Sequence, residues 1–375
     1  MAKQTNTSSK NVKKKTTGKT KKNSKNSKTE KKVNVKKLKV TAVIILLVGV
    51  LLIFSSYAWF SHNLNVRIKT FNMIVSENSG LEISFDGINF GTELEISAET
   101  LIDELVRTYP NNTSQWASMG LRPVSSNGIT NHNSQYFNIF FSGNGVQYPS
   151  LDLEDGYIYT EVAAETERRE YNSYIAFDLF FRNDTGSPVD DNVFLAEGSE
   201  ITIDERADEE MIGLLNSIRV GFVKIGTTSL DASVNEIQNV RCNNNCYSLI
   251  YEPYSTAHTN LSIERALKYN VNLVNGEYFD TYAFKRPGGP IYVENTVSGS
   301  PNLDMNYFEL QETMTENEID QPLFTVPNGV TKTRIYLWIE GQDIDSLETD
   351  SSGADLEISL GFVKDTAGYD TFNQD

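Results

Sequence analysis

The sequence predicts an all-β protein with minor helices, in which a β-sandwich follows one N-terminal transmembrane or signal helix. Three observations predict this fold class. A long apolar segment follows a lysine-rich tail, nearly all of the 18 Tyr and 19 Phe lie beyond that segment, and short stretches with apolar residues at alternate positions recur to the end of the chain. Aromatic and β-branched residues favour strands, and alternation is typical of a strand with one buried face.

The apolar segment covers residues 40–60, which are 21 residues without a charged side chain. A helix of this length, at about 1.5 Å per residue, matches the hydrocarbon core of a bilayer, and it lacks the polar face of a soluble surface helix. Residues 1–39 hold 15 Lys and one Glu, a formal charge of +14, and such an excess marks the cytoplasmic side. We therefore expect a single-pass protein of the cell membrane with a cytoplasmic N-terminus and an extracellular C-terminus.

The same segment has a second interpretation, as a cleaved signal peptide. Ser56 and Ala58 are small residues three and one positions before a candidate cleavage site between Ala58 and Trp59. Tyr57 and Trp59 suit the interfacial aromatic belt of an uncut helix equally well. Composition supports both interpretations, so the exterior part is predicted to be either tethered or, after cleavage near Ala58, secreted.

The charge of the chain is divided between two regions. The whole chain has a net charge of −17, so residues 40–375 carry −31, with 18 basic and 49 acidic side chains. This balance excludes a basic, nucleic-acid-binding exterior. The tail, residues 1–39, is of low complexity and is predicted to be disordered. Its charge alone suits contact with nucleic acid or with anionic lipid, and we assign it an orienting role next to lipid.

The first exterior strand contains a change of phase. Apolar residues alternate with polar ones on both sides of residue 69, but out of step: Leu64, Val66 and Ile68, then Phe71, Met73 and Val75. A one-residue slip turns every side chain to the opposite face, so we expect a bulge or a break at Lys69-Thr70. We expect 71–75 to belong to the sandwich. Residues 64–68 are then a stalk or, after cleavage, a free strand that adds to a neighbour's sheet edge.

Later strands follow the same pattern. Residues 81–90 predict a hairpin that turns at Asp86-Gly87, with Leu81, Ile83 and Phe85 on the way out and Ile88 and Phe90 on the way back. Further strands are predicted in the ranges 174–183, 217–225, 334–341 and 355–363. Each pattern buries one face, so the expected partner of each sheet is a second sheet.

Helices are expected in few places. Ser97 is a candidate N-cap for a helix that ends before Pro110, and two more helices are predicted at 208–216 and 262–269. The exterior domain, residues 61–375, also contains long stretches rich in Asn, Ser and Gly near 109–150 and 226–330. We interpret these two stretches as insertions in the sandwich or as a subdomain on it.

The stretch "SYAWFSHNLNVRIKTF" after the apolar helix, followed by "GLEISFDG" and a late "ADLEISLGFV", resembles TasA- and camelysin-type surface proteins of Gram-positive bacteria. This resemblance implies export through a SipW-type signal peptidase, a jelly-roll sandwich, and a role in the envelope or the biofilm matrix without catalysis. The long basic tail and the inserted middle depart from the family pattern.

Motifs of common enzyme classes are absent from the sequence. None of the three His occurs in H-E-x-x-H, and neither the nucleophile elbow G-x-S-x-G nor a phosphate-binding P-loop is present. Paired carboxylates for glycoside hydrolysis are not excluded by this count, and Glu340 beside Trp338 is the acid to test first. The alternative, that Glu340 is a solvated strand-end acid, is the more frequent situation.

Two cysteines, Cys242 and Cys246, occur in "RCNNNCYS". Outside the cell, a close and even pair is typical of a disulfide that closes a small loop. A zinc site would need two further ligands, and no other Cys or His lies near in sequence. We therefore predict a structural disulfide.

One acidic loop is a candidate calcium site, and no other cofactor is predicted. Its carboxylates are Asp343, Asp345, Glu348 and Asp350. Calcium takes six to eight oxygen ligands, but the spacing departs from the EF-hand pattern. A solvated acidic loop without an ion is the more frequent alternative.

The predicted function is that of a non-catalytic structural or adhesive protein of the cell surface or extracellular matrix. Its expected partners are the membrane and, through strand addition, other copies or other surface proteins. The alternative is a carbohydrate-binding module or glycan-active enzyme on a jelly-roll scaffold. A third class, a membrane-anchored sensor, would require a cytosolic partner for the tail.

Overall fold

The computed structural model divides the chain into two compact units, Met1–Tyr57 and Ala58–Asp375, and the fold described below belongs to the second. The structure describes Ile44 and the ranges 67–76, 80–117, 120–121, 123–130, 137–142, 162–164, 174–203, 209–242, 246–269, 273–274, 278–284, 292–293, 302–303, 308–346 and 355–366. Within these ranges, no helix is both long and apolar enough to cross a membrane. The predicted spanning segment, 40–60, lies outside them except for Ile44.

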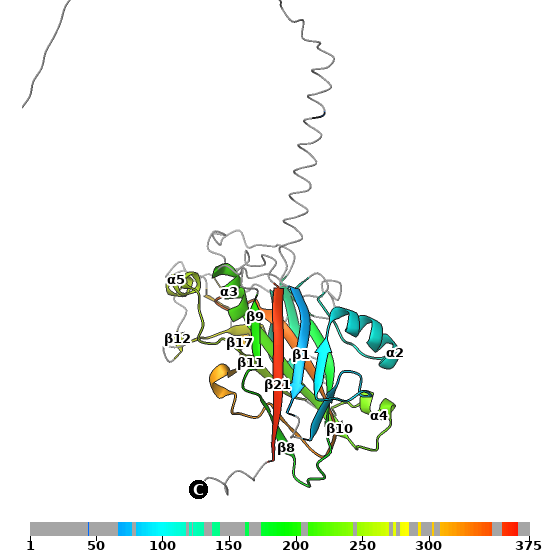
Figure 1. Ribbon diagram of the computed structural model, residues 1–375. Coiled ribbons are helices and arrows are strands. Elements are labelled where there is room, and N and C mark those ends of the chain that lie inside the picture. Colours follow the sequence, from blue (N-terminus) through cyan, green and yellow to red (C-terminus); the bar gives the residue numbers. More distant parts are fainter. Residues whose placement is uncertain are drawn as a thin grey trace, which may run out of the picture. The chain divides into compact units, whose positions relative to one another are not determined.

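One sheet has six strands and contains both the first and the last strand of the described chain (Figure 1). Its order is β19-β8-β21-β1-β3, and β9 also pairs with β21. The strands are β1 (Arg67–Val75), β3 (Glu93–Ile96), β8 (Asp191–Leu195), β9 (Glu200–Ile203), β19 (Phe324–Val326) and β21 (Asp355–Thr366). The first and last strands, β1 and β21, are parallel neighbours.

The other large sheet has nine strands in the order β18-β11-β10-β20-β4-β5-β6, with β7 paired to both β20 and β2. The strands are β2 (Leu81–Ser84), β4 (Pro123–Thr130), β5 (Phe137–Ser142), β6 (Val162–Ala164), β7 (Ile175–Asn183), β10 (Ile218–Thr228), β11 (Tyr247–Glu252), β18 (Met314–Thr315) and β20 (Gly329–Glu340). Both sheets mix parallel and antiparallel pairs. The predicted all-β class with few helices is therefore confirmed.

Three two-stranded pairs lie outside the large sheets. They are β12 (Leu273–Val274) with β13 (Tyr278–Phe279), β14 (Tyr282–Phe284) with β17 (Phe308–Leu310), and β15 (Tyr292–Val293) with β16 (Asn302–Leu303). The ranges interpreted as insertions also supply strands of the large sheets: 109–150 includes β4 and β5, and 226–330 includes β11, β18 and β19. These ranges are thus partly built into the sheets.

A shared apolar core joins the two large sheets. The ring of Phe181 in β7 meets the rings of Phe324 in β19 and Phe362 in β21 edge-on, with centroids 5.3 and 5.2 Å apart. Leu356, Ile358, Leu360 and Phe362 are all buried in this core, as the alternation in β21 predicts. Edge-on aromatic pairs add favourable contact beyond the area they bury.

The expectation of one buried face is wrong for the central strands of the nine-stranded sheet. All residues of β20 are buried, as are Ile218 to Val223 of β10. The face turned away from the shared core carries a second apolar cluster, which includes Tyr174, Tyr336 and Trp338. Polar residues at alternate positions of these strands are therefore interior residues, and each needs a partner inside the protein.

The bulge predicted at Lys69-Thr70 is confirmed. The pairing of β1 with β21 shifts register between Ile68 and Phe71, so that two residues of β1 oppose one residue of β21. The expectation that the strand is free before this point is wrong for its last two residues. Arg67 and Ile68 pair with Asp355 and Leu356, and Ile68 is buried. Residues 64–66 lie outside the described ranges.

The predicted hairpin at 81–90 is correct at its turn and wrong in its return strand. Gly87 has φ 71°, and the Asp86 carboxylate accepts hydrogen bonds from the amides of Ile88 and Asn89. These side-chain bonds hold the following residues in a loop, so that only Gly91 forms a bridge back to Ile83. The chain then crosses to the six-stranded sheet as β3, while β2 pairs with β7.

The helices are short. They are a π-helical turn (Thr100–Glu104) continued by α2 (Leu105–Thr108), then α3 (Glu209–Asn216), α4 (Val234–Gln238), α5 (Asn260–Tyr269) and a 3-10 turn (Glu316–Glu318). Those within 98–108, 209–216 and 260–269 lie where helices are predicted, whereas the helix at 234–238 and the turn at 316–318 are not predicted. Ser97 caps the first helix, since its Oγ accepts from the Thr100 amide at 3.2 Å. Leu101 and Leu105 are buried but Val106 is exposed, because a π turn adds a residue and rotates the apolar face.

Candidate functional site

Buried charged side chains gather where β20 ends, beside β10 and β11. We call Arg219, Glu252, Gln311, Glu340 and Asp343 the Arg219 cluster. The Arg219 Nη2 atom lies 2.6 Å from Asp343 Oδ2 and 2.7 Å from Glu252 Oε1, and its Nε donates to Gln311 Oε1 at 3.0 Å. Burial alone lowers the pKa of Arg219, but Glu252, Asp343 and Glu340 raise it overall. One guanidinium therefore holds together strands β10 and β11 and the segment after β20.

Glu340, the candidate catalytic acid, is a fully buried member of this cluster. Its side chain is 0% exposed and accepts hydrogen bonds from Trp338 Nε1 at 3.1 Å, Gln311 Nε2 at 2.9 Å and the Ser126 amide at 3.2 Å. Burial raises the pKa of Glu340. The interpretation as a solvated strand-end acid is wrong, because the carboxyl group is enclosed and hydrogen-bonded within the protein.

Two of the four candidate calcium ligands are engaged with the protein itself. Asp343 binds Arg219, while Asp345 Oδ2 lies 2.6 Å from His258 Nδ1 and its Oδ1 accepts from the Thr259 amide at 3.0 Å. Glu348 and Asp350 lie outside the described ranges. Among described residues, no three or more His, Cys, Asp or Glu are grouped as metal ligands. The calcium site stays a prediction.

The cluster carries a specific pH dependence through Asp343, whose pKa burial raises to about 6. The folded state thus binds this proton more tightly than the unfolded chain, where the ordinary value is 3.8. Stability from this group is full below about pH 4 and is lost between about pH 4 and 6. In the unaltered protein the free energy of unfolding should fall as the pH rises from about 4 to 6. In Asp343→Asn this fall should be smaller by about 1–3 kcal/mol, as measured by denaturant titration at a series of pH values.

The matched control for this prediction is Asp320→Asn, since Asp320 is exposed. It should leave the pH profile of stability unchanged. An unchanged profile for Asp343→Asn would show that Asp343 does not ionise in this window. The raised pKa of Glu340, caused by burial, acts in the same direction and should preserve a residual slope in the variant.

A second group of buried charges lies nearer the start of β20. We call Asp178, Lys332, Arg334 and Tyr109 the Asp178 cluster. Lys332 Nζ is 3.1 Å from Asp178 Oδ2, Arg334 Nη1 is 3.2 Å from Oδ1, and the Tyr109 hydroxyl donates to Oδ2 at 2.7 Å. Burial alone raises the pKa of Asp178, but Lys332 and Arg334 lower it overall. One carboxylate therefore serves two buried cations.

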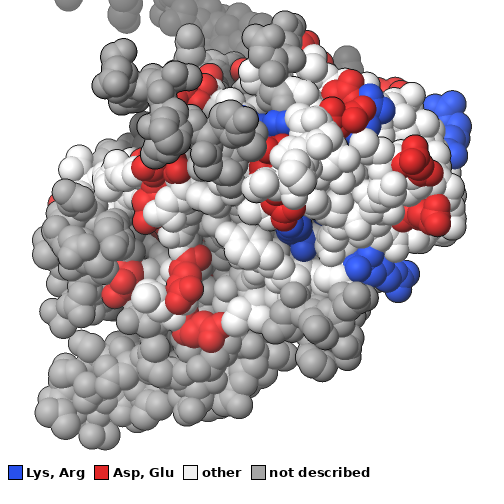
Figure 2. Space-filling model, turned by 90° about the horizontal axis from the view of Figure 1, so that it is seen from below, with Lys and Arg blue, Asp and Glu red and all other residues white. Residues whose placement is uncertain are grey.

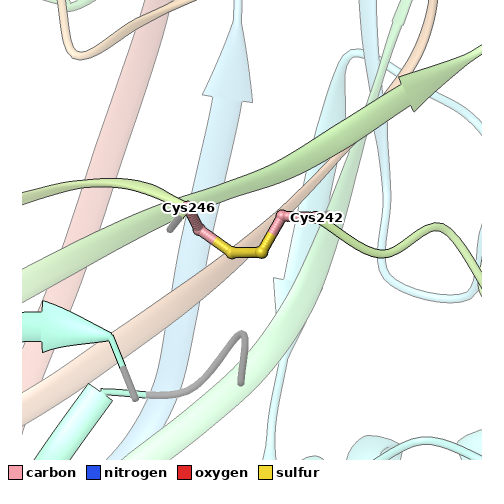
Figure 3. The surroundings of a disulfide bond; sticks show 2 residues. All are labelled: Cys242 and Cys246. Atoms are coloured by element: carbon pink, nitrogen blue, oxygen red, sulfur yellow. A yellow bond between two sulfur atoms is a disulfide. The ribbon is translucent and has the colours of Figure 1, made fainter. Parts of the chain in front are cut away.

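Cys242 and Cys246 are joined by a disulfide in the structure (Figure 3). Their Cα atoms are 5.7 Å apart, and Cys246 is buried directly before β11. The bond fixes the chain where it enters β11, and neither sulfur belongs to the two charged clusters. Its place suits a structural role.

The sequence did not identify most members of these clusters. The alternation in 217–225 places Arg219 on the polar side of its strand, and Glu252, Gln311 and Asp178 carry no motif. Arg219 and Lys332 are charged residues inside strands whose other face is strongly apolar. This pattern does not identify them as buried, because a strand with one solvated face shows the same pattern. Ala58 and Trp59, the candidate cleavage residues, lie outside the described ranges.

Comparison with known proteins gives no relative for this chain: no family model, no curated protein and no solved structure matches it.

Proposed function

We propose that this chain is a non-catalytic structural protein of the cell surface, whose double sheet carries mechanical load between the membrane and the exterior. The resemblance to TasA- and camelysin-type proteins and the predicted apolar helix are part of this proposal. The observation that carries it is the parallel pairing of the first and last described strands, β1 and β21.

Parallel neighbours place the two ends of the described fold at opposite ends of one ladder. Arg67 at the start of β1 pairs with Asp355 at the start of β21, and Val75 pairs with Phe362. A force that pulls the N-terminus against the C-terminus then acts along the strands, so that the hydrogen bonds between them share the load. Phe71, Met73 and Val75 are also buried in the core, which resists sliding.

The residues nominated for carbohydrate chemistry support the structural role. Trp338 and Glu340 are both fully buried, so neither offers a ring face or an acid to a sugar. Acidic side chains are spread over the described part of the face in Figure 2, interleaved with basic ones. Such a surface suits a soluble exterior domain. β21 already pairs with Arg67 and Ile68, so these two residues are not available to add to the sheet of a neighbouring copy. Self-assembly by strand addition is therefore proposed only for residues before Arg67.

Single-molecule pulling on the full chain in detergent tests the load-bearing role. With handles at the two termini, β1 and β21 are sheared. With handles at the N-terminus and at exposed Glu99, β1 is instead peeled from its antiparallel neighbour β3 pair by pair, since Phe71 pairs with Ile96. We expect the first unfolding force to be more than about twofold higher in the terminal geometry, because several hydrogen bonds break together.

Both geometries use the same molecule, so differences in overall stability do not enter the comparison. Equal unfolding forces would remove the mechanical role and leave the paired terminal strands without a functional consequence.

A further inference from the structure

A lysine, an asparagine and an aspartate meet in the interior between the two sheets. We call Lys364, Asn183 and Asp191 the amide triad. Lys364 Nζ lies 2.9 Å from Asn183 Oδ1 and 3.2 Å from Asp191 Oδ2, and Asn183 Nδ2 donates to the same Asp191 Oδ2 at 2.9 Å. The side chains of Lys364 and Asp191 are 5% and 0% exposed, and Asn183 is 0% exposed. An amine, a carboxamide and a carboxyl group are therefore held in mutual contact away from water.

Each member of the triad comes from a different strand. Buried aromatic rings lie next to it, and the Thr185 hydroxyl lies 3.4 Å from both Asn183 Oδ1 and Asp191 Oδ2. Lys364 belongs to β21, Asn183 ends β7, and Asp191 begins β8. Phe362 and Phe181, which pack edge-on, lie two residues before Lys364 and Asn183 and so on the same faces of their strands. Asn183 Nδ2 also donates to the Val326 carbonyl at 3.1 Å, which fixes the carboxamide.

We propose that Lys364 and Asn183 form an intramolecular isopeptide bond, with Asp191 as the group that transfers the proton. In the first step Asp191 Oδ2, which lies 3.2 Å from Lys364 Nζ, takes one proton from the ammonium group and leaves a neutral amine and a neutral acid. The Nζ lone pair then attacks Asn183 Cγ, which is one bond from the Oδ1 atom that Nζ already contacts. Because the fold already holds the two groups in contact, the reaction step does not include the entropy cost of bringing them together.

The atoms of the reaction balance without metal or oxidant. A bond forms between Lys364 Nζ and Asn183 Cγ, and the bond between Cγ and Nδ2 breaks. Asp191 gives a proton to Nδ2, which leaves as ammonia, and takes a proton from Nζ, so that it ends as the acid it was before the attack. Its Oδ2 is within hydrogen-bond distance of both nitrogens, which is the geometry that this relay needs.

The bond would join the two sheets covalently. It links β7 of the nine-stranded sheet with β21 of the six-stranded sheet, between residues separated by 181 positions. A cross-link over so long a loop strongly restricts the unfolded chain. It would also prevent β21, the partner of β1, from leaving the fold. The reaction is a property of the folded chain and does not depend on the proposed surface role.

Tryptic mapping of the full chain under denaturing conditions tests the bond directly. Without it, cleavage after Arg182, Arg206, Arg334 and Lys364 releases 183–206, 335–364 and 365–375 as separate peptides. With it, Lys364 resists cleavage, and 183–206 appears joined to 335–375 with a mass lower by one ammonia. Neither peptide contains cysteine, so a disulfide cannot join them. Recovery of only separate peptides, with cleavage after Lys364, would overturn the proposal and leave a buried ion pair.

The residue that lost ammonia must be identified, because Asn-Gly sequences such as Asn328-Gly329 also lose ammonia when they form succinimides. The joined peptide is therefore the required observation, and an intact mass alone is insufficient.

Asp191→Asn tests the proton-transfer role, and Asp190→Asn is its matched control, since Asp190 is the exposed neighbouring residue. We expect the joined peptide to disappear in Asp191→Asn and Lys364→Arg and to persist in Asp190→Asn. A joined peptide in Asp191→Asn would remove Asp191 from the reaction. If a variant fails to fold, the map of the unaltered protein still decides whether the bond exists.

Discussion

Replacement of Arg219 by methionine is expected to lower the free energy of unfolding at pH 7 by about 3–5 kcal/mol. Arg219 is fully buried and contacts Glu252 and Asp343 at 2.7 and 2.6 Å. Methionine fills much of the volume but supplies no cation, so that these carboxylates and Glu340 remain in the interior without their counter-charge. Denaturant titration by circular dichroism measures the loss.

The loss should also depend on pH in a defined direction. Arg219 lowers the pKa of Asp343 and of Glu340, so without it both carboxyl groups bind protons more tightly in the folded state, and the deficit should shrink as the pH falls from 7 towards 5. Arg241→Met is the control, because Arg241 is exposed, and it should change stability by about 0.5 kcal/mol or less. A deficit for Arg219→Met that is small and independent of pH would contradict the assigned electrostatic role.

Replacement of Asp178 by asparagine is expected to destabilise the protein by a similar amount, about 3–5 kcal/mol. The substitution keeps the size of the side chain but removes the single carboxylate that pairs with Lys332 and Arg334. Both cations are almost completely buried and lie on the same face of β20. The penalty therefore arises from leaving these cations unpaired, and thermal and denaturant unfolding should both report it.

A double variant separates this penalty from the loss of packing. When Lys332→Met is combined with Asp178→Asn, one buried cation is removed together with its carboxylate. The loss of unfolding free energy in the double variant should therefore be about 1–3 kcal/mol smaller than the sum of the losses in the two single variants. The exposed Asp184→Asn serves as the surface control. Simple additivity would show that Lys332 and Asp178 do not interact energetically.

Local sequence determined much of the strand framework. The alternation in 355–363 and the change of phase around residue 69 are properties of a few neighbouring residues, and they appear in the structure as β21 and as the register shift of β1. The cap of Ser97 followed in the same way from one side chain and one amide three residues later. The capping box of Ser233 and Glu236, which begins α4, is an equally local signal that the sequence also contains.

Tertiary structure alone decided what the polar residues do. Glu340, Arg219 and Lys332 sit at positions that a strand pattern assigns to solvent, and they are buried because a second apolar cluster covers the outer face of β10 and β20. A local pattern shows which face a side chain takes but not whether that face is covered. The amide triad makes the same point: Lys364 and Asn183 are 181 residues apart, and only the packing of the two sheets brings the amine to the carboxamide.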